Sequence, residues 1–289
     1  MKFDFETVLT RAGQITWRYK NLWLAGIAIS LVSLLLAPII LAFSSFAAPS
    51  EVNQQLPSMM LANVTAILLA ILSIPIFVIA ISIPSLGTFQ VEQGSENVRF
   101  GQLVRGVLPY FWRVSGIVLL VSGGMFLAVL MLIVFAFSIS VLTMGIGLLC
   151  IFPLLILIIM MVILGYALME QAVSAVLVDN LRVSSALQRA WELVMKNPGL
   201  MTLMSLINYV GAIVAILIIL SILTTLPMFG SEPDIQSFRN MMWMLAFLPF
   251  YVVFQGVLVT SFQSVWTLIY LRLTRGSTSQ PVLPETAPS

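Results

Sequence analysis

Six long apolar runs constrain this chain more than any other feature of its sequence. They cover residues 21–46, 59–89, 114–140, 148–169, 200–226 and 241–271. Each run reaches the roughly 20 residues that a helix needs to cross a hydrocarbon core about 30 Å thick. Backbone groups inside a bilayer must bond to one another, and the runs lack the alternation of a barrel strand, so helices are expected. We therefore predict an all-α integral membrane protein with six transmembrane helices.

The composition excludes several catalytic classes of protein. Of the 289 residues, 60% are hydrophobic and 8% are charged, whereas soluble domains carry about 25% charged residues. The sequence contains no histidine and one cysteine, Cys150, which excludes His-based triads, most zinc sites and disulfide frameworks. Glycine-rich phosphate loops, paired catalytic carboxylates and a basic nucleic-acid surface do not stand out. We expect no enzyme activity, catalytic residue, metal, cofactor or nucleic-acid partner.

The basic residues indicate the orientation of the predicted spans. Of the 13 lysines and arginines, only Arg239 falls on one side of a six-span arrangement. The others are Lys2, Arg11, Arg18, Lys20, Arg99, Arg105, Arg113, Arg182, Arg189, Lys196, Arg272 and Arg275. The positive-inside rule therefore places both termini in the cytoplasm. Small residues at 45–48 are typical of a signal-peptidase site, but the preceding apolar run is longer than the 7–15 residues of a secretory signal, so we expect no cleavage.

Three segments on the predicted cytoplasmic side repeat the same amphipathic pattern. Apolar residues recur every three or four positions in residues 5–16, 100–111 and 183–194, which is the period of one helix face. A shift of 95 positions places Phe5 on Phe100 and Trp17 on Trp112, and each segment precedes a pair of spans. We predict three repeats of amphipathic interfacial helix plus transmembrane hairpin, at about residues 3–97, 98–180 and 181–276. A disordered cytoplasmic tail is expected at 277–289.

Two interpretations of the amphipathic helices remain open. We expect their apolar stripes to enter the acyl boundary, where basic side chains meet anionic head groups. The candidate contacts to anionic lipid are Arg18, Arg113, Arg182, Arg189 and Lys196. In the simpler interpretation the helices only hold the hairpins at a fixed depth, and the basic residues only orient the chain during insertion. In the other, they recruit lipid or a partner protein to the cytoplasmic face.

Polar side chains on the apolar runs are the candidate functional residues: Glu170, Asn208, Gln255 and Gln263. They could line a polar path, although interhelical hydrogen bonding is the simpler interpretation. An acid within a span is a functional hypothesis by default. We expect the fourth span to end near Met169, which makes Glu170 an interfacial charge. If the helix instead continues to Val178, Glu170 lies about 13 Å below Asp179 along the axis. Prolines and glycines on the spans offer an alternative, the broken helices of a transporter.

Two segments that lead into spans resemble a known family. Residues 16–23 read TWRYKNLW, and residues 178–197 read VDNLRVSSALQRAWELVMKN. They resemble the bacterial multi-span family named after the membrane domain found with glycerophosphoryl diester phosphodiesterases. The resemblance covers most of residues 1–275 and implies a helical membrane domain, whose stand-alone members have no assigned activity. The family's phosphodiesterase domain is a separate soluble barrel that uses histidine, which this chain lacks, so hydrolysis is not implied.

Together these features predict a multi-pass protein of the bacterial plasma membrane, with membrane lipids and a protein at the cytoplasmic face as partners. The expected function is non-enzymatic: a scaffold or accessory protein in envelope or lipid homeostasis. The alternative is a transporter or lipid-moving protein that uses the space between hairpins. A membrane-embedded enzyme is a third and weaker hypothesis, because Glu170 and Asp179 lack evident partners and a catalytic site needs several cooperating groups.

Overall fold

The computed structural model describes residues 5–32, 56–95, 98–143, 151–224 and 235–275. Within these ranges the chain forms helices and short turns, with no strand, so the prediction of an all-helical protein is confirmed. The amphipathic segments form α1 (Phe5–Arg18), α4 (Phe100–Val107) and α7 (Val183–Lys196). The apolar runs form α3 (Leu56–Glu92), α5 (Phe111–Leu142), α6 (Ile151–Asp179), α8 (Pro198–Thr224) and α9 (Ile235–Arg275). A 3₁₀ turn, Lys20–Leu22, connects α1 to a helix over residues 23–32, and another, Leu108–Tyr110, connects α4 to α5.

Five helices are long and apolar enough to cross a membrane. Their apolar segments are Ser73–Glu92, Phe100–Val141, Pro153–Asp179, Pro198–Ile218 and Ala246–Thr274. The first of the six predicted spans, at residues 21–46, is described only as far as Val32, where it is a shorter apolar helix. Its remainder and the predicted tail at 277–289 lie outside the described residues. The chain is thus a multi-pass helical protein by the length and composition of these five helices.

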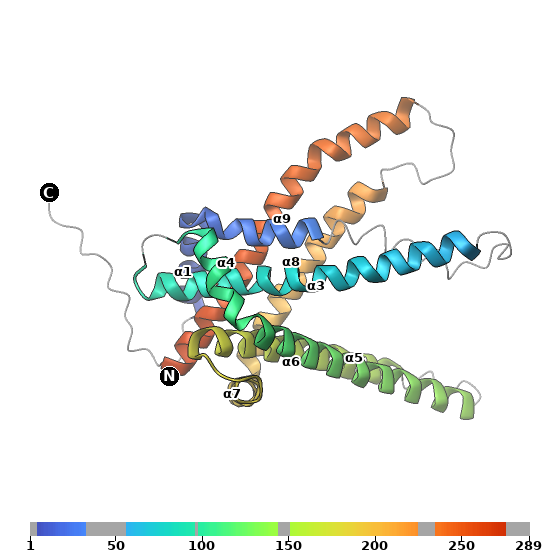
Figure 1. The fold of residues 1–289 in the computed structure, drawn as a ribbon. Helices are drawn as coiled ribbons and strands as arrows, with labels where there is room; N and C mark the ends of the chain where they lie inside the picture. Colours follow the sequence, from blue (N-terminus) through green and yellow to red (C-terminus); the bar gives the residue numbers. More distant parts are fainter. Residues whose placement is uncertain (1–4, 33–55, 96–97, 144–150, 225–234, 276–289) are drawn as a thin grey trace.

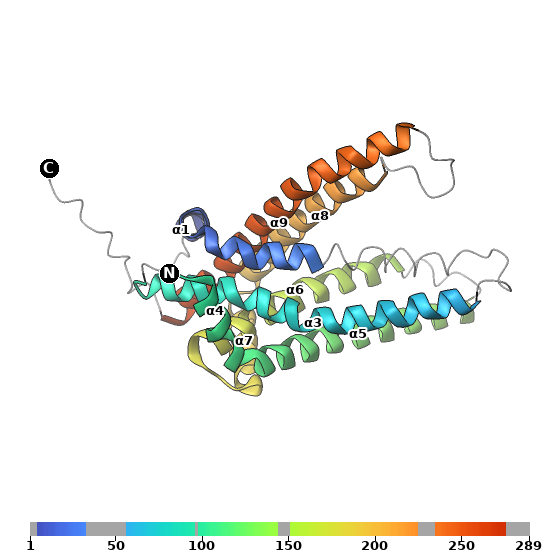
Figure 2. The same cartoon turned by 45° about the horizontal axis from the view of Figure 1, so that its top comes forward.

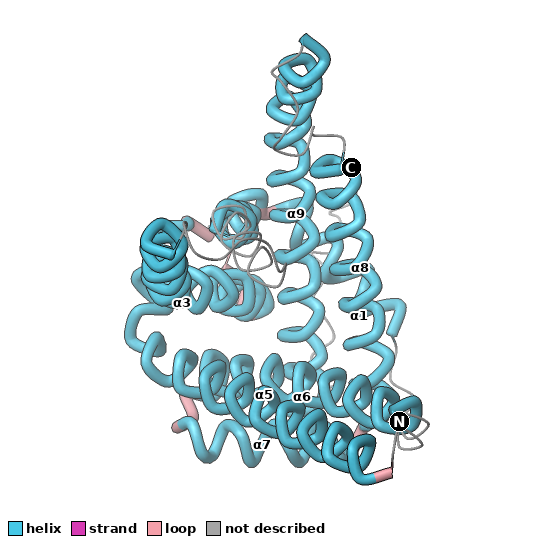
Figure 3. Tube along the Cα trace, turned by 90° about the vertical axis from the view of Figure 1, so that its right-hand side faces the viewer, coloured by secondary structure: helices cyan, strands magenta, loops and turns pink. Residues whose placement is uncertain are grey.

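The long helices converge at one end of the molecule, where α1, α4 and α7 also lie (Figure 1). Figure 2 shows α5 beside α6 and α8 beside α9. Toward the other end, α8 and α9 diverge from α3, α5 and α6, as Figure 3 shows from that side. α9 is central, because it packs against α1, α3, α6 and α8. Burial does not follow this division. It is highest in α3 and α9, where 61% and 56% of an apolar 18-residue stretch are buried, against 11% in α5.

Part of the apolar stripe on each amphipathic helix packs into the protein, while Leu9 and Trp191 of the predicted stripes are 40% and 52% exposed. Val8, Ala12 and Ile15 of α1 are buried in the same hydrophobic core as residues of α3, α6 and α9. Leu103 and Val107 of α4 are buried there as well, and so are Ala186, Ala190, Leu193 and Val194 of α7. These buried residues therefore contact protein, which differs from the expectation that they enter lipid with the rest of their stripes. The period of three and four residues indicates a helix face in an apolar environment. For the buried residues, that environment is the neighbouring long helices.

Close backbone contact joins the first and last described parts of the chain. A Cβ atom added at Gly26 would lie 2.5 Å from the carbonyl oxygen of Gly256 in α9, so the two helices cross with backbone against backbone. Thr260, one turn further along α9, donates a hydrogen bond of 3.1 Å to the carbonyl oxygen of Leu22. α9 runs without a break through Pro249, and α3 does so through its two internal prolines. The described spans therefore do not have the broken helices that proline and glycine can mark.

Candidate functional site

Glu170 is buried inside the bundle, with an exposed fraction of 3%. α6 continues to Asp179, beyond the expected end of this span near Met169, and Glu170 is enclosed by protein and not exposed. It lies nine residues, or about 13 Å, before the end of the helix. Residues 172–177 are all buried, mostly in the hydrophobic core. The helix therefore continues past Glu170 with its side chains packed against protein.

The Glu170 carboxylate is the centre of a hydrogen-bonded network that we call the Glu170 network. Gln263 of α9 donates from Nε2 to Glu170 Oε1 over 3.0 Å. Ser85 of α3 donates from Oγ to Gln263 Oε1 over 3.2 Å. On the same face of α6, one turn before Glu170, the Tyr166 hydroxyl lies next to the Glu170 carboxyl group. Asn208 of α8 donates from Nδ2 to that hydroxyl over 2.6 Å. Side chains of α3, α6, α8 and α9 are thus connected around Glu170, and Gln263 is the described side chain from another helix that bonds to its carboxyl group directly.

The structure brings together three of the four predicted polar residues, Glu170, Asn208 and Gln263, although they lie on three different helices. Gln255 lies elsewhere. Its Nε2 donates to the hydroxyl of Tyr251, one turn earlier on α9, over 2.7 Å. Gln171, the neighbour of Glu170, is also fully buried, but neither end of its carboxamide has a hydrogen-bond partner among the described residues. Buried polar groups normally have partners, so Gln171 is an exception in this core.

Small hydroxyl residues extend the polar core and were not among the predicted candidates. Ser82, Ser85 and Thr88 are buried on one face of α3 at intervals of three residues. Thr88 donates to Ser264 of α9 over 2.9 Å. The sequence did contain a signal for this contact. The regular spacing of hydroxyl residues on α3 is matched by polar residues at similar intervals on α9: Thr260, Gln263, Ser264 and Thr267. Serine and threonine can bond to their own helix backbone, so their presence on a span does not by itself indicate a contact between helices.

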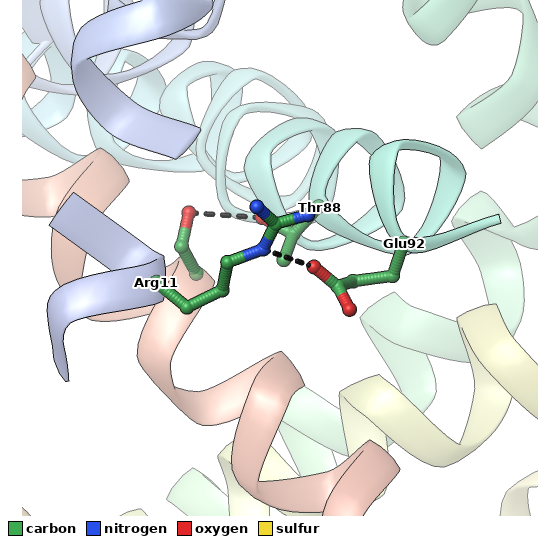
Figure 4. Close-up of polar contacts among 4 residues, drawn as sticks. Arg11, Thr88 and Glu92 are labelled. Carbon is green, nitrogen blue, oxygen red and sulfur yellow. Dashed lines mark hydrogen bonds and ion pairs between the residues drawn. The ribbon is translucent and has the colours of Figure 1, made fainter. Parts of the chain in front are cut away.

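An ion pair lies next to this polar core, at the end of the molecule where the long helices converge. Arg11 Nε of α1 lies 2.8 Å from Glu92 Oε1 at the end of α3, close to the Thr88 contact (Figure 4). Exposed fractions of 31% and 27% leave both side chains partly in contact with solvent. α1 is also joined to α9 by hydrogen bonds from Ser261 to Thr16 and from Arg272 to Thr7. Together these contacts fix α1 across the ends of α3 and α9.

The five predicted lipid contacts do not form one cluster. Arg18 lies over the ring of Tyr19, with 5.9 Å from its guanidinium carbon to the ring centroid. Arg189 pairs weakly with Glu192 at 3.8 Å, and Lys196 is exposed at the end of α7. Arg113 and Arg182, by contrast, line one open pocket of about 630 Å³ between α5 and the start of α7.

The Glu170 network contains a carboxylate, two carboxamides, a phenol and a hydroxyl, which are groups that bind by hydrogen bonds. Among the described residues, no three His, Cys, Asp or Glu side chains gather as metal ligands would. Interhelical hydrogen bonds in membranes contribute from a fraction of a kcal/mol to about 2 kcal/mol each. The arrangement is therefore well suited to hold α3, α6, α8 and α9 together. The chain matches no family model, no curated protein and no solved structure.

Proposed function

We propose that the protein crosses the membrane six times as three units, each an amphipathic helix followed by a helical hairpin. The order of elements supports this proposal. α1 precedes the helix over residues 23–32 and α3, α4 precedes α5 and α6, and α7 precedes α8 and α9. The three amphipathic helices lie at the same end of the bundle (Figure 1). The bias of basic residues to this end makes it the cytoplasmic one.

The proposed function is that of a non-enzymatic scaffold or accessory protein in a bacterial plasma membrane, acting in envelope or lipid homeostasis. The family resemblance of residues 16–23 and 178–197 is the reason for the bacterial setting. The observation that carries the scaffold role is the outward face of the amphipathic helices. Their inner stripes are buried, whereas Trp17 of α1 and Trp191 of α7 are 64% and 52% exposed. Trp112, at the start of α5 just after α4, is 80% exposed. Exposed tryptophan suits the membrane interface and protein contacts alike, because its ring is apolar and its N–H is polar.

Site-specific photocrosslinking in cells tests the scaffold role. A photoreactive residue is placed at Gln14 of α1 or at Gln188 of α7, both exposed and polar, and the matched control replaces Phe126, which is exposed on the apolar face of α5. We expect discrete protein adducts from the two cytoplasmic positions and none from the control. The absence of protein adducts from both positions contradicts the scaffold role, as does lipid or phosphodiester turnover by the purified protein that Glu170→Gln abolishes.

A second function, lipid movement, is favoured by the pocket between α5 and α7 and by the divergence of α8 and α9 from the other spans (Figure 3). Proteoliposomes carrying fluorescent lipids would measure it. Transfer between leaflets that needs the protein would support this alternative over the scaffold role, and no transfer over a broad lipid panel would refute it.

A further inference from the structure

The pocket between α5 and α7 gathers positive charge at one end and apolar side chains at the other. It is lined by Arg113 and Leu120 of α5, by Arg182 just before α7, and by Val183, Ser184 and Leu187 of α7. Arg113 and Leu120 are seven residues apart on one face of α5, so they lie about 10 Å apart along the helix. Arg113 is near the cytoplasmic end, and Leu120 is deeper in the span. The pocket thus has the polarity of an amphiphile lying along the membrane normal.

Both guanidinium groups have hydrogen-bond donors to spare. Arg113 uses Nη1 on the carbonyl oxygen of Asn180, at 3.2 Å, and on its side-chain Oδ1, at 2.7 Å. Its Nε and Nη2 groups have no protein partner among the described residues, and the exposed Arg182 side chain has none there either. Asp179, the nearest acid along the chain, accepts a hydrogen bond from Tyr270. Within the part of the chain that the structure describes, no carboxylate pairs with the positive charge at this end of the pocket.

The start of α7 adds to the same charge. Arg182 occupies the N-cap position without a side-chain cap, and the first bond of the helix runs from the Ala186 N–H to the Arg182 carbonyl oxygen. The N–H groups of residues 183–185 consequently have no acceptor within the helix. A helix N-terminus of this kind favours an anion, and a cation beside it is unfavourable until an anion arrives.

The apolar end of the pocket continues toward lipid. Leu120 is well exposed, as are Leu119 beside it and Phe126 further along α5. Cβ atoms added at Gly123 or Gly124 would meet nothing within 4 Å, so the surface of α5 beyond Leu120 is open. Acyl chains from a head group at Arg113 and Arg182 would have a continuous apolar surface along this helix.

We propose that this pocket binds the phosphodiester head group of an anionic glycerophospholipid, with its acyl chains along α5. The inference rests on the proposed orientation, with α7 at the cytoplasmic face, but it does not depend on the scaffold role. Loss of lipid binding and loss of protein adducts are separate readouts, so either can fail alone.

Native mass spectrometry of the full chain in a mild neutral detergent tests the assignment. The probes are dioleoyl phosphatidylglycerol and dioleoyl phosphatidylcholine, and the measured quantity is the dissociation constant of the first bound lipid. Arg182→Gln is the main variant, since its side chain has no described protein partner. Arg105→Gln is the matched control, because Arg105 is an exposed arginine on α4 that does not line the pocket. Arg113→Gln is a second variant, although it also removes the bonds to Asn180.

We expect phosphatidylglycerol to bind more tightly than phosphatidylcholine. Arg182→Gln should weaken phosphatidylglycerol binding about fivefold, the factor that corresponds to about 1 kcal/mol per basic residue near a head group, and should leave phosphatidylcholine binding unchanged. Equal binding of the two lipids, or equal effects of Arg182→Gln and Arg105→Gln, would overturn the proposal. Millimolar inorganic phosphate is the final arm. Full displacement of phosphatidylglycerol by phosphate would identify a site for free anions and refute the lipid assignment.

Discussion

The contact between Gly26 and Gly256 gives a sharp test of how the first helix is held against α9. In Gly26→Ala, the new Cβ would lie 2.5 Å from the Gly256 carbonyl oxygen, 2.7 Å from its Cα and 2.9 Å from its carbonyl carbon. All three obstructing atoms are backbone, so no side chain can rotate away. The helices would have to separate by about 1 Å to restore an ordinary contact distance. That displacement would also strain the hydrogen bond from Thr260 to Leu22.

The expected loss of stability follows from two opposing terms. Overpacking in a close-packed interior costs about 1–3 kcal/mol, and a backbone obstruction belongs at the upper end of that range. Replacing glycine by alanine within a helix returns up to about 1 kcal/mol. We therefore expect Gly26→Ala to lower the free energy of unfolding by about 2 kcal/mol, which changes the unfolding equilibrium roughly 30-fold.

Reversible unfolding in mixed micelles, followed by tryptophan fluorescence, measures this difference. Gly123→Ala is the matched control, because it is also a glycine within a span but its added Cβ would meet nothing within 4 Å. It should be neutral or slightly stabilising. If the two variants unfold within about 0.5 kcal/mol of each other, the backbone contact does not limit stability and the reasoning is refuted.

Three further predictions concern polar contacts and topology. Glu170→Ala should destabilise the bundle by about 1–3 kcal/mol in the same titration, because the Gln263 amide and the Tyr166 hydroxyl lose a buried partner. Glu170→Gln keeps an oxygen acceptor and should lose less, so equal losses would contradict the role of the carboxyl oxygen. A double-mutant cycle of Arg11→Ala and Glu92→Ala should give a coupling energy of about 0–1 kcal/mol that decreases with salt, since the pair is partly exposed. A coupling energy that does not change with salt would show that the pair is not screened by solvent. In a Cys150→Ser background, Gln188→Cys should resist an impermeant maleimide in intact cells and Ser231→Cys should react, and the reverse pattern would invert the proposed topology.

The positions of the helices were predictable, whereas the faces they present were not. Hydropathy located α5, α8 and α9 to within several residues, because about 20 apolar residues in sequence suffice to indicate a span. The same signal ended the fourth apolar run at Met169, whereas α6 continues to Asp179. Hydropathy sums apolar character along the chain and contains no information on whether a residue such as Glu170 faces lipid, water or another helix.

The amphipathic helices show the same division. Their period of three and four residues predicted α1, α4 and α7, since that spacing arises from helix geometry within one segment. It did not determine that Val8 and Ala12 contact α9 and its neighbours and not acyl chains. Lipid tails and a protein core are both apolar, so an apolar stripe fits either environment equally well.

The sequence by itself determined an all-helical membrane chain, its amphipathic segments and the residue types available for polar contacts. Only the tertiary structure decided that Gln263 bonds to Glu170, that Asn208 joins them through Tyr166, that Gln255 lies elsewhere, and that Arg113 and Arg182 line one pocket. The physical reason is that these contacts depend on the rotation and depth of each helix relative to its neighbours. Those are set by the packing of whole surfaces, such as Gly26 against Gly256, between segments more than 200 residues apart.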